Sequence, residues 1–291
     1  MFQHRGDWLK SENNKIVYNA FTVDFEDWYQ GVELPIESWG MYEERLEKST
    51  DVLLNVFKEN DVRATFFVLG YNANRYPHLL RKIIEEGHRI GSHGDKHEYV
   101  YKMTPDEFRV DLRCSLDSIF NACKVKPESY RAPFFSITRR SFWALECLSE
   151  FGIRYDSSIV PVNYYRYGIP DCPLEIHAPL TGSCSDGLKE FPISTIKLFG
   201  RRFPLSGGTY FRIMPYRMVR DGIKHLNAQG KPIIFYVHPW EIDPEQPRIA
   251  LPSRVRLPHY AKLNSTLPKL KKLLRDFKFA PMEEVIEHAT N

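Results

Sequence analysis

Two histidines stand four residues apart in the segment Ser92-His93-Gly94-Asp95-Lys96-His97. Imidazole nitrogens are common zinc ligands, and two side chains at this spacing can face one cation if the segment makes a helical turn. Such pairs also occur by chance on exposed helices, although Gly91 and Gly94 disfavour an ordinary amphipathic helix here. His93 and His97 are therefore candidate metal ligands.

Three carboxylates lie within four residues in Asp24-Phe25-Glu26-Asp27, directly after an apolar stretch. Like charges this close repel one another and need a cation or a proton nearby. A metal would satisfy the cluster and leave one carboxylate free as a general base. The alternative is a solvated loop at the end of a strand. The alternation of side chains along a strand would place Asp24 and Glu26 on one face.

Two further motifs place an arginine and a histidine where they could take part in catalysis. Tyr130-Arg131-Ala132-Pro133-Phe134-Phe135 sets Arg131 close to a rigid proline, and its planar guanidinium can orient a carboxylate. Phe235-Tyr236-Val237-His238-Pro239-Trp240-Glu241 delivers His238 into a Pro-Trp turn. An imidazole titrates in a range that suits protonation of a leaving amine. A core histidine with a satisfied hydrogen bond is the alternative.

The elements that must position these residues alternate between strand and helix. The alternation predicts a parallel sheet or barrel, in which active sites gather at the carboxyl ends of the strands. All four motifs follow such ends. The expected strands are residues 16–23, 63–69, a short run into His93, 130–134, 153–156 and 232–237, and the expected helices are 43–59, 77–86, one that opens at 104–107, 138–151 and 215–229.

Two regions depart from this alternation. Residues 157–212 are interrupted by prolines and glycines, and we expect an inserted loop and strand region that caps the site. Residues 250–291 are expected to form a helical extension, with leucines against basic side chains at 266–277. A basic helix face can touch anionic lipid, and a solvated surface is the alternative.

Composition narrows the class of protein. A chain of 291 residues with 43% hydrophobic content can bury a large core, and its net charge of +3 indicates no general attraction to nucleic acid. Five cysteines without a C-x-x-C pair fit neither a disulfide framework nor a cysteine-rich zinc site, so we expect reduced thiols. No segment is typical of a signal peptide or a membrane span. We expect a cytoplasmic protein, free or at the inner face of the membrane.

Taken in order, the four motifs resemble those of the polysaccharide deacetylases, also called carbohydrate esterase family 4. The resemblance covers about residues 16–245. A closer similarity is to the bacterial branch associated with exopolysaccharide loci. It is carried by Phe191-Pro192-Ile193-Ser194, by Gly207-Gly208-Thr209-Tyr210-Phe211-Arg212 and by His238-Pro239-Trp240-Glu241-Ile242-Asp243-Pro244.

The resemblance implies a distorted (β/α) barrel with fewer than eight strands, formed by one deacetylase domain over residues 1–291. It also implies a divalent metal, with zinc favoured over cobalt, nickel or manganese, held by His93, His97 and a carboxylate. Many relatives have two adjacent aspartates in the first motif, whereas this chain has Asp24, Glu26 and Asp27. The metal carboxylate is Glu26 or Asp27, of which Asp27 is preferred.

The family's catalytic roles fall on Asp24 as general base, Arg131 as the residue that orients it, and His238 as general acid. Other residues are expected to bind the substrate. They are a backbone N–H near Phe134 for the oxyanion, Phe135, Trp240 and Tyr210 as stacking walls for a sugar ring, with ordinary packing as the alternative, and Asp156 in Tyr155-Asp156-Ser157-Ser158 as a groove wall.

The expected activity is hydrolysis of N-acetyl groups on amino sugars of a polysaccharide or lipid-linked glycan precursor, which releases acetate. The expected partner is an N-acetylated glycan, with no nucleic acid and at most a weak peripheral membrane contact. A non-catalytic glycan-binding or assembly protein on the same scaffold, and a hydrolase of a non-sugar amide, are the alternatives. Acetate release with and without a chelator separates the enzyme from the binding protein.

Overall fold

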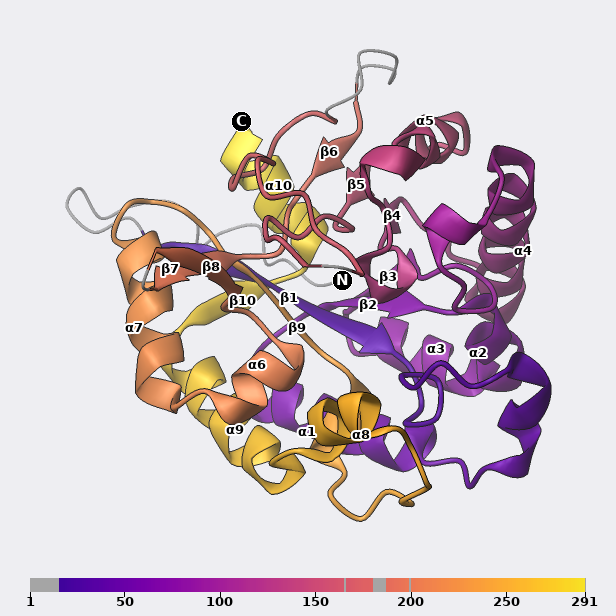
Figure 1. Cartoon of the computed structure of the whole chain (residues 1–291), viewed down its shortest axis with the longest axis horizontal. Coiled ribbons are helices and arrows are strands. Elements are labelled where there is room, and N and C mark those ends of the chain that lie inside the picture. The colour runs from indigo at the N-terminus through magenta and orange to yellow at the C-terminus, as the bar shows by residue number, and fades with distance from the viewer. Residues whose placement is uncertain (1–15, 165, 180–186, 199, 291) are drawn as a thin grey trace.

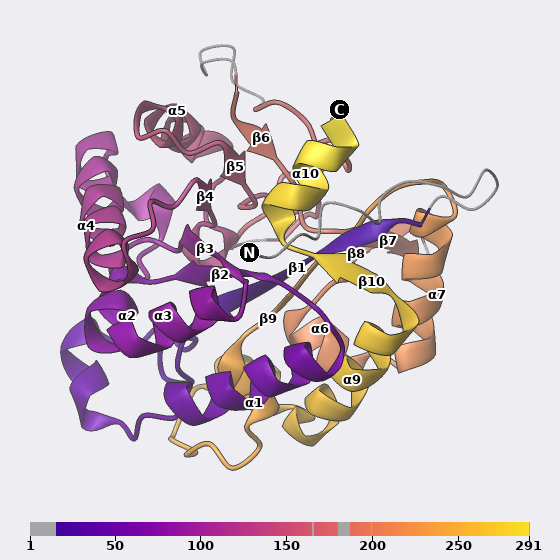
Figure 2. The ribbon, with the colours of Figure 1, turned by 180° about the vertical axis from the view of Figure 1, so that it is seen from behind.

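The scaffold of the protein is a curled sheet whose hydrogen-bonded neighbours all run parallel. The computed structural model describes residues 16–164, 166–179, 187–198 and 200–290. Figures 1 and 2 show helices around the outside of this sheet. Its strands are β1 (Tyr18–Phe25), β2 (Thr65–Val68), β3 (Arg89–Ser92), β4 (Ser129–Tyr130), β5 (Tyr155–Asp156), β6 (Lys189–Glu190), β9 (Ile234–Val237) and β10 (Lys278–Ala280).

Strand β1 has three neighbours in the sheet. Strand β9 pairs along one side of it, and the other side is shared by β10, next to Tyr18, and by β2, next to Phe25. Counted from β9 through β1 and β2 to β6, the described part of the sheet is seven strands wide, with β10 in line with β2. This confirms the predicted distorted barrel with fewer than eight strands.

The gap between β6 and β9 is closed by the chain that follows β6. Leu205 N–H donates to the Ser194 carbonyl at 2.9 Å, and Tyr236 N–H of β9 donates to the Ser206 carbonyl at 3.1 Å. Gly207 pairs with Tyr236 in an isolated bridge, with φ of 133°. A Cβ there would lie 2.2 Å from the Tyr236 carbonyl oxygen, so only glycine allows this approach.

The helices largely follow the predicted order. In the first part of the chain α4 begins as predicted, because Thr104 and Glu107 form a capping box and Pro105 occupies the first turn. The helices are α1 (Leu46–Glu59), α2 (Gly70–Arg75), α3 (Pro77–Glu85), α4 (Pro105–Cys123), α5 (Trp143–Glu150), α6 (Gly208–Ile213), α7 (Tyr216–Asn227), α8 (Ser253–Tyr260), α9 (Thr266–Asp276) and α10 (Met282–Thr290), with short 3-10 turns at Ile36–Met41, Val100–Lys102, Pro133–Phe135, Arg139–Ser141, Pro239–Ile242 and Leu263–Ser265.

The two regions that break the alternation supply parts of the barrel itself. Residues 157–212 contain β6, the closing segment, α6 and an antiparallel hairpin of β7 (Thr195–Leu198) and β8 (Arg201–Pro204). Residues 250–291, expected to be helical, also contain β10, which pairs with β1. The C-terminal region is therefore built into the central sheet.

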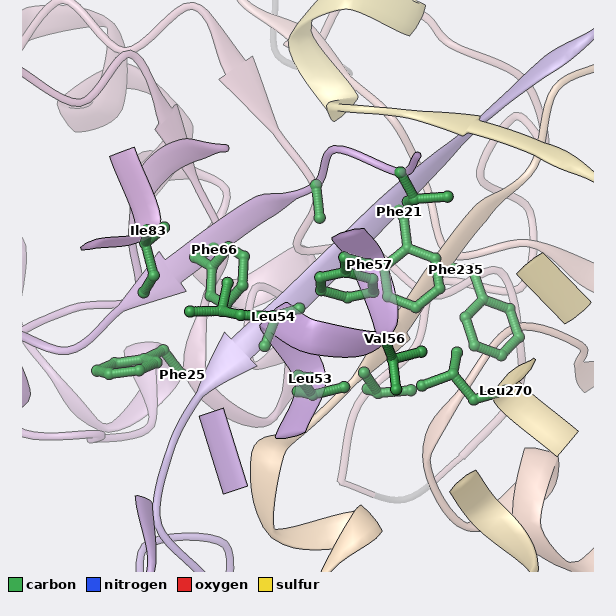
Figure 3. Close-up of a cluster of buried hydrophobic side chains, with 14 of the residues drawn as sticks. Phe21, Phe25, Leu53, Leu54, Val56, Phe57, Phe66, Ile83, Phe235 and Leu270 are labelled. Atoms are coloured by element: carbon green, nitrogen blue, oxygen red, sulfur yellow. The ribbon is translucent and has the colours of Figure 1, made fainter. Parts of the chain in front are cut away.

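A large cluster of apolar side chains lies between the sheet and helices α1 and α9 (Figure 3). The ring of Phe21 lies 5.1 Å from that of Phe57 in α1 and 5.5 Å from that of Phe235 in β9, measured between centroids. Burial of each such ring contributes about 1.5–3 kcal/mol. Because Phe21 and Phe25 belong to this outer cluster and side chains alternate along a strand, Asp24 faces the inside of the barrel.

Two sequence expectations concern the protein's surroundings. None of the described helices is long and apolar enough to span a bilayer. Cys114, Cys123, Cys147 and Cys172 are free thiols, as predicted, and Cys184 lies outside the described residues.

Candidate active site

Both histidines and one carboxylate of the acidic segment meet at the carboxyl ends of β1 and β3. Glu26 Oε1 lies 3.0 Å from Nε2 of His93 and 3.0 Å from Nε2 of His97. All three side chains are buried. Two imidazoles and a carboxylate with ligand atoms within 4.8 Å of one another form a donor set that suits a divalent cation.

The two histidines reach this point by different routes. His93 directly follows strand β3, whereas His97 lies within the loop that follows and has φ of 57°. The segment therefore does not make the helical turn that the spacing suggested. The loop is fixed instead by Asp111 of α4, whose carboxylate accepts the N–H of Asp95 at 3.0 Å.

Hydrogen bonding around the rings leaves nitrogen lone pairs for a cation. His93 Nδ1 lies 2.7 Å from the Arg131 carbonyl oxygen and so donates its proton there, which leaves a lone pair on Nε2. His97 Nε2 is buried and, although it lies 3.0 Å from Glu26 Oε1, is not aligned to form a hydrogen bond. Burial alone would raise the pKa of Glu26, but the neighbouring imidazoles, His97 first, hold that pKa well below its usual range. These residues therefore fit a bound divalent metal.

A second charged group lies beside the first, inside the barrel. Arg131 donates from Nη1 to Asp24 Oδ1 at 2.7 Å and to Thr22 Oγ1 at 2.8 Å. Its Nε and Nη2 donate to the carbonyl and hydroxyl oxygens of Ser157 at 3.1 and 3.0 Å. The other Asp24 oxygen, Oδ2, lies 3.8 Å from His238 Nε2. The structure thus brings together the base, orienting arginine and acid that the sequence suggested.

Glu241 and Arg212, which had no predicted role, hold His238 in place. Its Nδ1 lies 3.0 Å from Glu241 Oε2, and Glu241 Oε1 accepts from Arg212 Nε at 2.8 Å. Burial alone would lower the pKa of His238, but the nearby carboxylates, Glu26 first, raise it to about 9. Burial would raise the pKa of Glu241, but Arg212 and His238 lower it to about 2. The site therefore favours a protonated imidazole.

Asp27 lies outside both groups. Its Oδ1 accepts the Trp28 N–H at 2.8 Å, and its Oδ2 accepts the N–H groups of Arg45 and Leu46 at 2.8 and 3.1 Å. These last two donors open helix α1, so Asp27 caps that helix from a distant segment. Burial raises its pKa to about 6, against the effect of the N–H groups. The geometry favours Glu26 over Asp27 as metal ligand, the reverse of the preference drawn from the resemblance.

Asp156 is fully buried and offers no exposed wall to a groove. It accepts a hydrogen bond from Ser158 Oγ at 2.6 Å and pairs in register with Glu190 of β6. Burial raises the pKa of Asp156 to about 6 and holds that of Glu190 well above its usual range. Its segment contributes to the site through Ser157, which contacts Arg131.

The predicted aromatic walls differ in how much surface they expose. Trp240 is only 6% exposed, and its ring stacks on those of His238 and His259 at centroid distances of 5.1 and 4.3 Å. Neighbouring side chains therefore cover the Trp240 ring, which was expected to bind sugar. Phe135 and Tyr210 are partly exposed.

Phe134 contacts the metal-site loop directly. Its ring stacks on Tyr99 at 4.4 Å and lies 4.3 Å from the His97 ring. With φ of 55° its backbone is left-handed, which is rare for a bulky residue and is typical of functional sites. An oxyanion contact from a backbone N–H near Phe134 stays a prediction.

Two sequence-family models match consecutive parts of the chain. Residues 37–155 match the family described as polysaccharide deacetylase, and residues 157–287 match a domain of unknown function, DUF3473. A peptidoglycan-N-acetylglucosamine deacetylase from Bacillus cereus is 33% identical over 98 residues, which is 33% of this chain and 36% of that protein. Chitin deacetylase 1 from Saccharomyces cerevisiae is 33% identical over 92 residues, 32% of this chain and 30% of that protein. The chain thus spans about a third of these curated relatives.

A solved structure extends the likeness to the whole fold. A Mycobacterium smegmatis protein assigned to the polysaccharide deacetylases has a TM-score of 0.63 and 22% identity, and the match covers 96% of this chain and 92% of that one. The segments matched by the two family models contribute strands to the same sheet. The chain therefore carries a polysaccharide deacetylase domain with the fold of carbohydrate esterase family 4.

Proposed function

We propose that the protein is a metal-dependent hydrolase that removes N-acetyl groups from amino sugars of a glycan. One observation carries the proposal, the meeting of two groups at one end of the barrel. The group of Glu26, His93 and His97 suits a metal, and the adjacent Asp24 has one oxygen fixed and the other facing His238. Polysaccharide deacetylation requires such a combination of electrophile, base and acid.

Glu26, His93 and His97 would hold the ion, and two imidazoles with one carboxylate favour zinc, with cobalt, nickel or manganese as alternatives. When bound, such an ion supplies Lewis-acid polarisation of the acetyl carbonyl and acidifies a coordinated water.

Asp24 is the proposed general base. Arg131 occupies Oδ1, which leaves Oδ2 to take a proton from the attacking water. The water oxygen bonds to the acetyl carbon, and the bond from that carbon to nitrogen then breaks. His238 gives its Nε2 proton to the departing nitrogen, so the products are acetate and a free amine.

The proposed substrate is an N-acetylated polysaccharide or lipid-linked glycan precursor. The relatives named for peptidoglycan N-acetylglucosamine and for chitin support this class. The partly exposed rings of Phe135 and Tyr210 are suited to contact a sugar face. A place in exopolysaccharide synthesis, a cytoplasmic location and a weak membrane contact are further predictions from the sequence.

Acetate release from N-acetylglucosamine oligomers, with and without a chelator, tests the proposal. We expect chelator-sensitive release that is lost in Asp24→Asn with bound metal retained, and lost in His93→Ala together with the metal. Asp106→Asn, in an exposed aspartate at the start of α4, is the control for a neutral change. Full turnover by Asp24→Asn would exclude the proposed base.

A further inference from the structure

Glu241 joins His238 to a buried chain of contacts that runs into the C-terminal part of the molecule. Its Oε2 accepts the backbone N–H of His238 at 3.1 Å and contacts the Nδ1 of the same residue at 3.0 Å. Its Oε1 accepts from Arg212 Nε at 2.8 Å. The side chains of Glu241 and Arg212 are each 1% exposed. Both carboxylate oxygens are therefore fixed in place.

The local sequence builds this contact. Pro239 opens a 3-10 turn, and Glu241 in that turn returns its carboxylate to the N–H of His238, as in a capping box. The same carboxylate thus fixes both the backbone and the ring of one residue. The His-Pro-Trp-Glu order makes that geometry a local property of the chain.

Arg212 of α6 is enclosed by the segment that forms the end of α8. One of its five N–H groups is directed at Glu241, and the other four have partners as well. Three of the acceptors are backbone carbonyls, which cannot neutralise its charge, so Glu241 supplies the counter-charge. The four partners are the carbonyls of Pro258, His259 and Ala261 and the hydroxyl of Thr209.

These contacts determine which nitrogen of His238 can act on a substrate. With Nδ1 directed at Glu241, the other ring nitrogen, Nε2, faces Asp24 at 3.8 Å. Trp240 stacks on the His238 ring and is itself stacked on His259, which limits rotation of the imidazole. An acid that must deliver its proton to one nitrogen of the substrate needs such a fixed tautomer and direction.

We propose that Glu241 is the positioning residue of the general acid His238 and that Arg212 fixes Glu241. Every member of this chain of contacts lies in residues 157–287, the segment matched by the domain of unknown function. Orientation of the acid is therefore one task of that segment. The inference rests on the proposed deacetylase function for the role of His238.

The test uses two substrates that differ in their need for an acid. An amide must be protonated at nitrogen before it leaves, whereas 4-nitrophenyl acetate releases a stable aryl oxide without help. For Glu241→Gln we expect kcat on an N-acetylglucosamine oligomer to fall about 100- to 1,000-fold, with KM within about 3-fold and metal content unchanged. Turnover of the ester should fall by less than about 3-fold.

Glu283→Gln is the matched control, because Glu283 is a partly buried glutamate that accepts hydrogen bonds from Thr65 and Ser129 at the opposite end of the barrel. Both its activities should equal those of wild type. Arg212→Lys, which keeps the charge and loses the planar set of donors, should show the amide-selective pattern more weakly, at about 10-fold. If Glu241→Gln does not fold, Arg212→Lys provides the test. Equal losses on both substrates, or no loss on either, would overturn the proposal.

A proton NMR measurement separates this inference from the proposed function. The Nδ1–H of His238 on a carboxylate should give a low-field ring N–H resonance in the wild-type holoenzyme. It should disappear in His238→Asn and move to higher field in Glu241→Gln. If the wild type releases no acetate, the proposed function fails, while this resonance still reports whether Glu241 holds the ring. Its absence from the wild type would overturn the positioning role.

Discussion

Replacing Arg131 by methionine would leave Asp24 ionised inside the barrel without the guanidinium that lies 2.7 Å away. The two side chains are 0% and 3% exposed, so bulk water solvates the pair poorly and compensates little for the lost partner. Methionine also leaves Thr22 and Ser157 without their donors. Removal of one member of a buried ion pair costs about 3–5 kcal/mol, which is the loss we expect in the free energy of unfolding.

A double-mutant cycle isolates the pair itself. Asp24→Asn removes the negative charge, so combining it with Arg131→Met should cost about 2–3 kcal/mol less than the sum of the single changes. Urea unfolding of the four proteins in chelator keeps metal binding out of the comparison. Asp24→Asn combined with Glu283→Gln, at the far end of the barrel, should be additive within about 0.5 kcal/mol. Additive effects of Arg131→Met and Asp24→Asn would refute the proposed coupling.

Three other outcomes are expected. Glu26→Gln should lose the bound metal in elemental analysis, whereas Asp27→Ala should retain it and lower the free energy of unfolding by about 2 kcal/mol through loss of the α1 cap; metal loss in both would contradict the assignment. Burial lowers the pKa of His88 to about 4 from an unfolded value of 6.5, and its Nδ1 accepts the Ala64 N–H, so the folded state needs the neutral ring. The stabilisation by the neutral His88 ring is therefore complete above pH 6.5, and the free energy of unfolding should fall by about 3 kcal/mol as the pH drops to 4. Urea unfolding at a series of pH values should show a weaker pH dependence in His88→Asn. Gly207→Ala should cost about 3 kcal/mol in thermal unfolding, against little change for Gly40→Ala, where an added Cβ meets nothing within 4 Å.

The parts of the site that the sequence predicts depend on short-range patterns. The alternation of β1 already puts Asp24 and Glu26 on one face, and both do contribute to the clustered groups. The preference for Asp27 came from relatives with adjacent aspartates. The Asp27 carboxylate instead accepts from N–H groups at the start of α1, beyond an intervening loop. No local sequence pattern predicts such a contact.

The contacts that hold His238 show more clearly which features of the site cannot be predicted from sequence. Glu241 and Arg212 lie in motifs that the resemblance includes, but their pairing depends on how α6 and α8 pack. Helix α8 contains Pro258 and has no clear apolar face, so periodicity could not predict it. Strand β10, at three residues, is too short for alternation to reveal it.

One side of β1 pairs with both β2 and β10, and this arrangement has a consequence for synthesis on the ribosome. The Asn19 side chain donates to the Lys278 carbonyl at 3.3 Å, across 259 positions of sequence. At translation rates of about 5–20 residues per second, β1 leaves the ribosome roughly 10–50 seconds before β10 can pair with it. Until β9 and then β10 emerge, both edges of the first half of β1 lack their strand partners, and unpaired strand edges attract other strands.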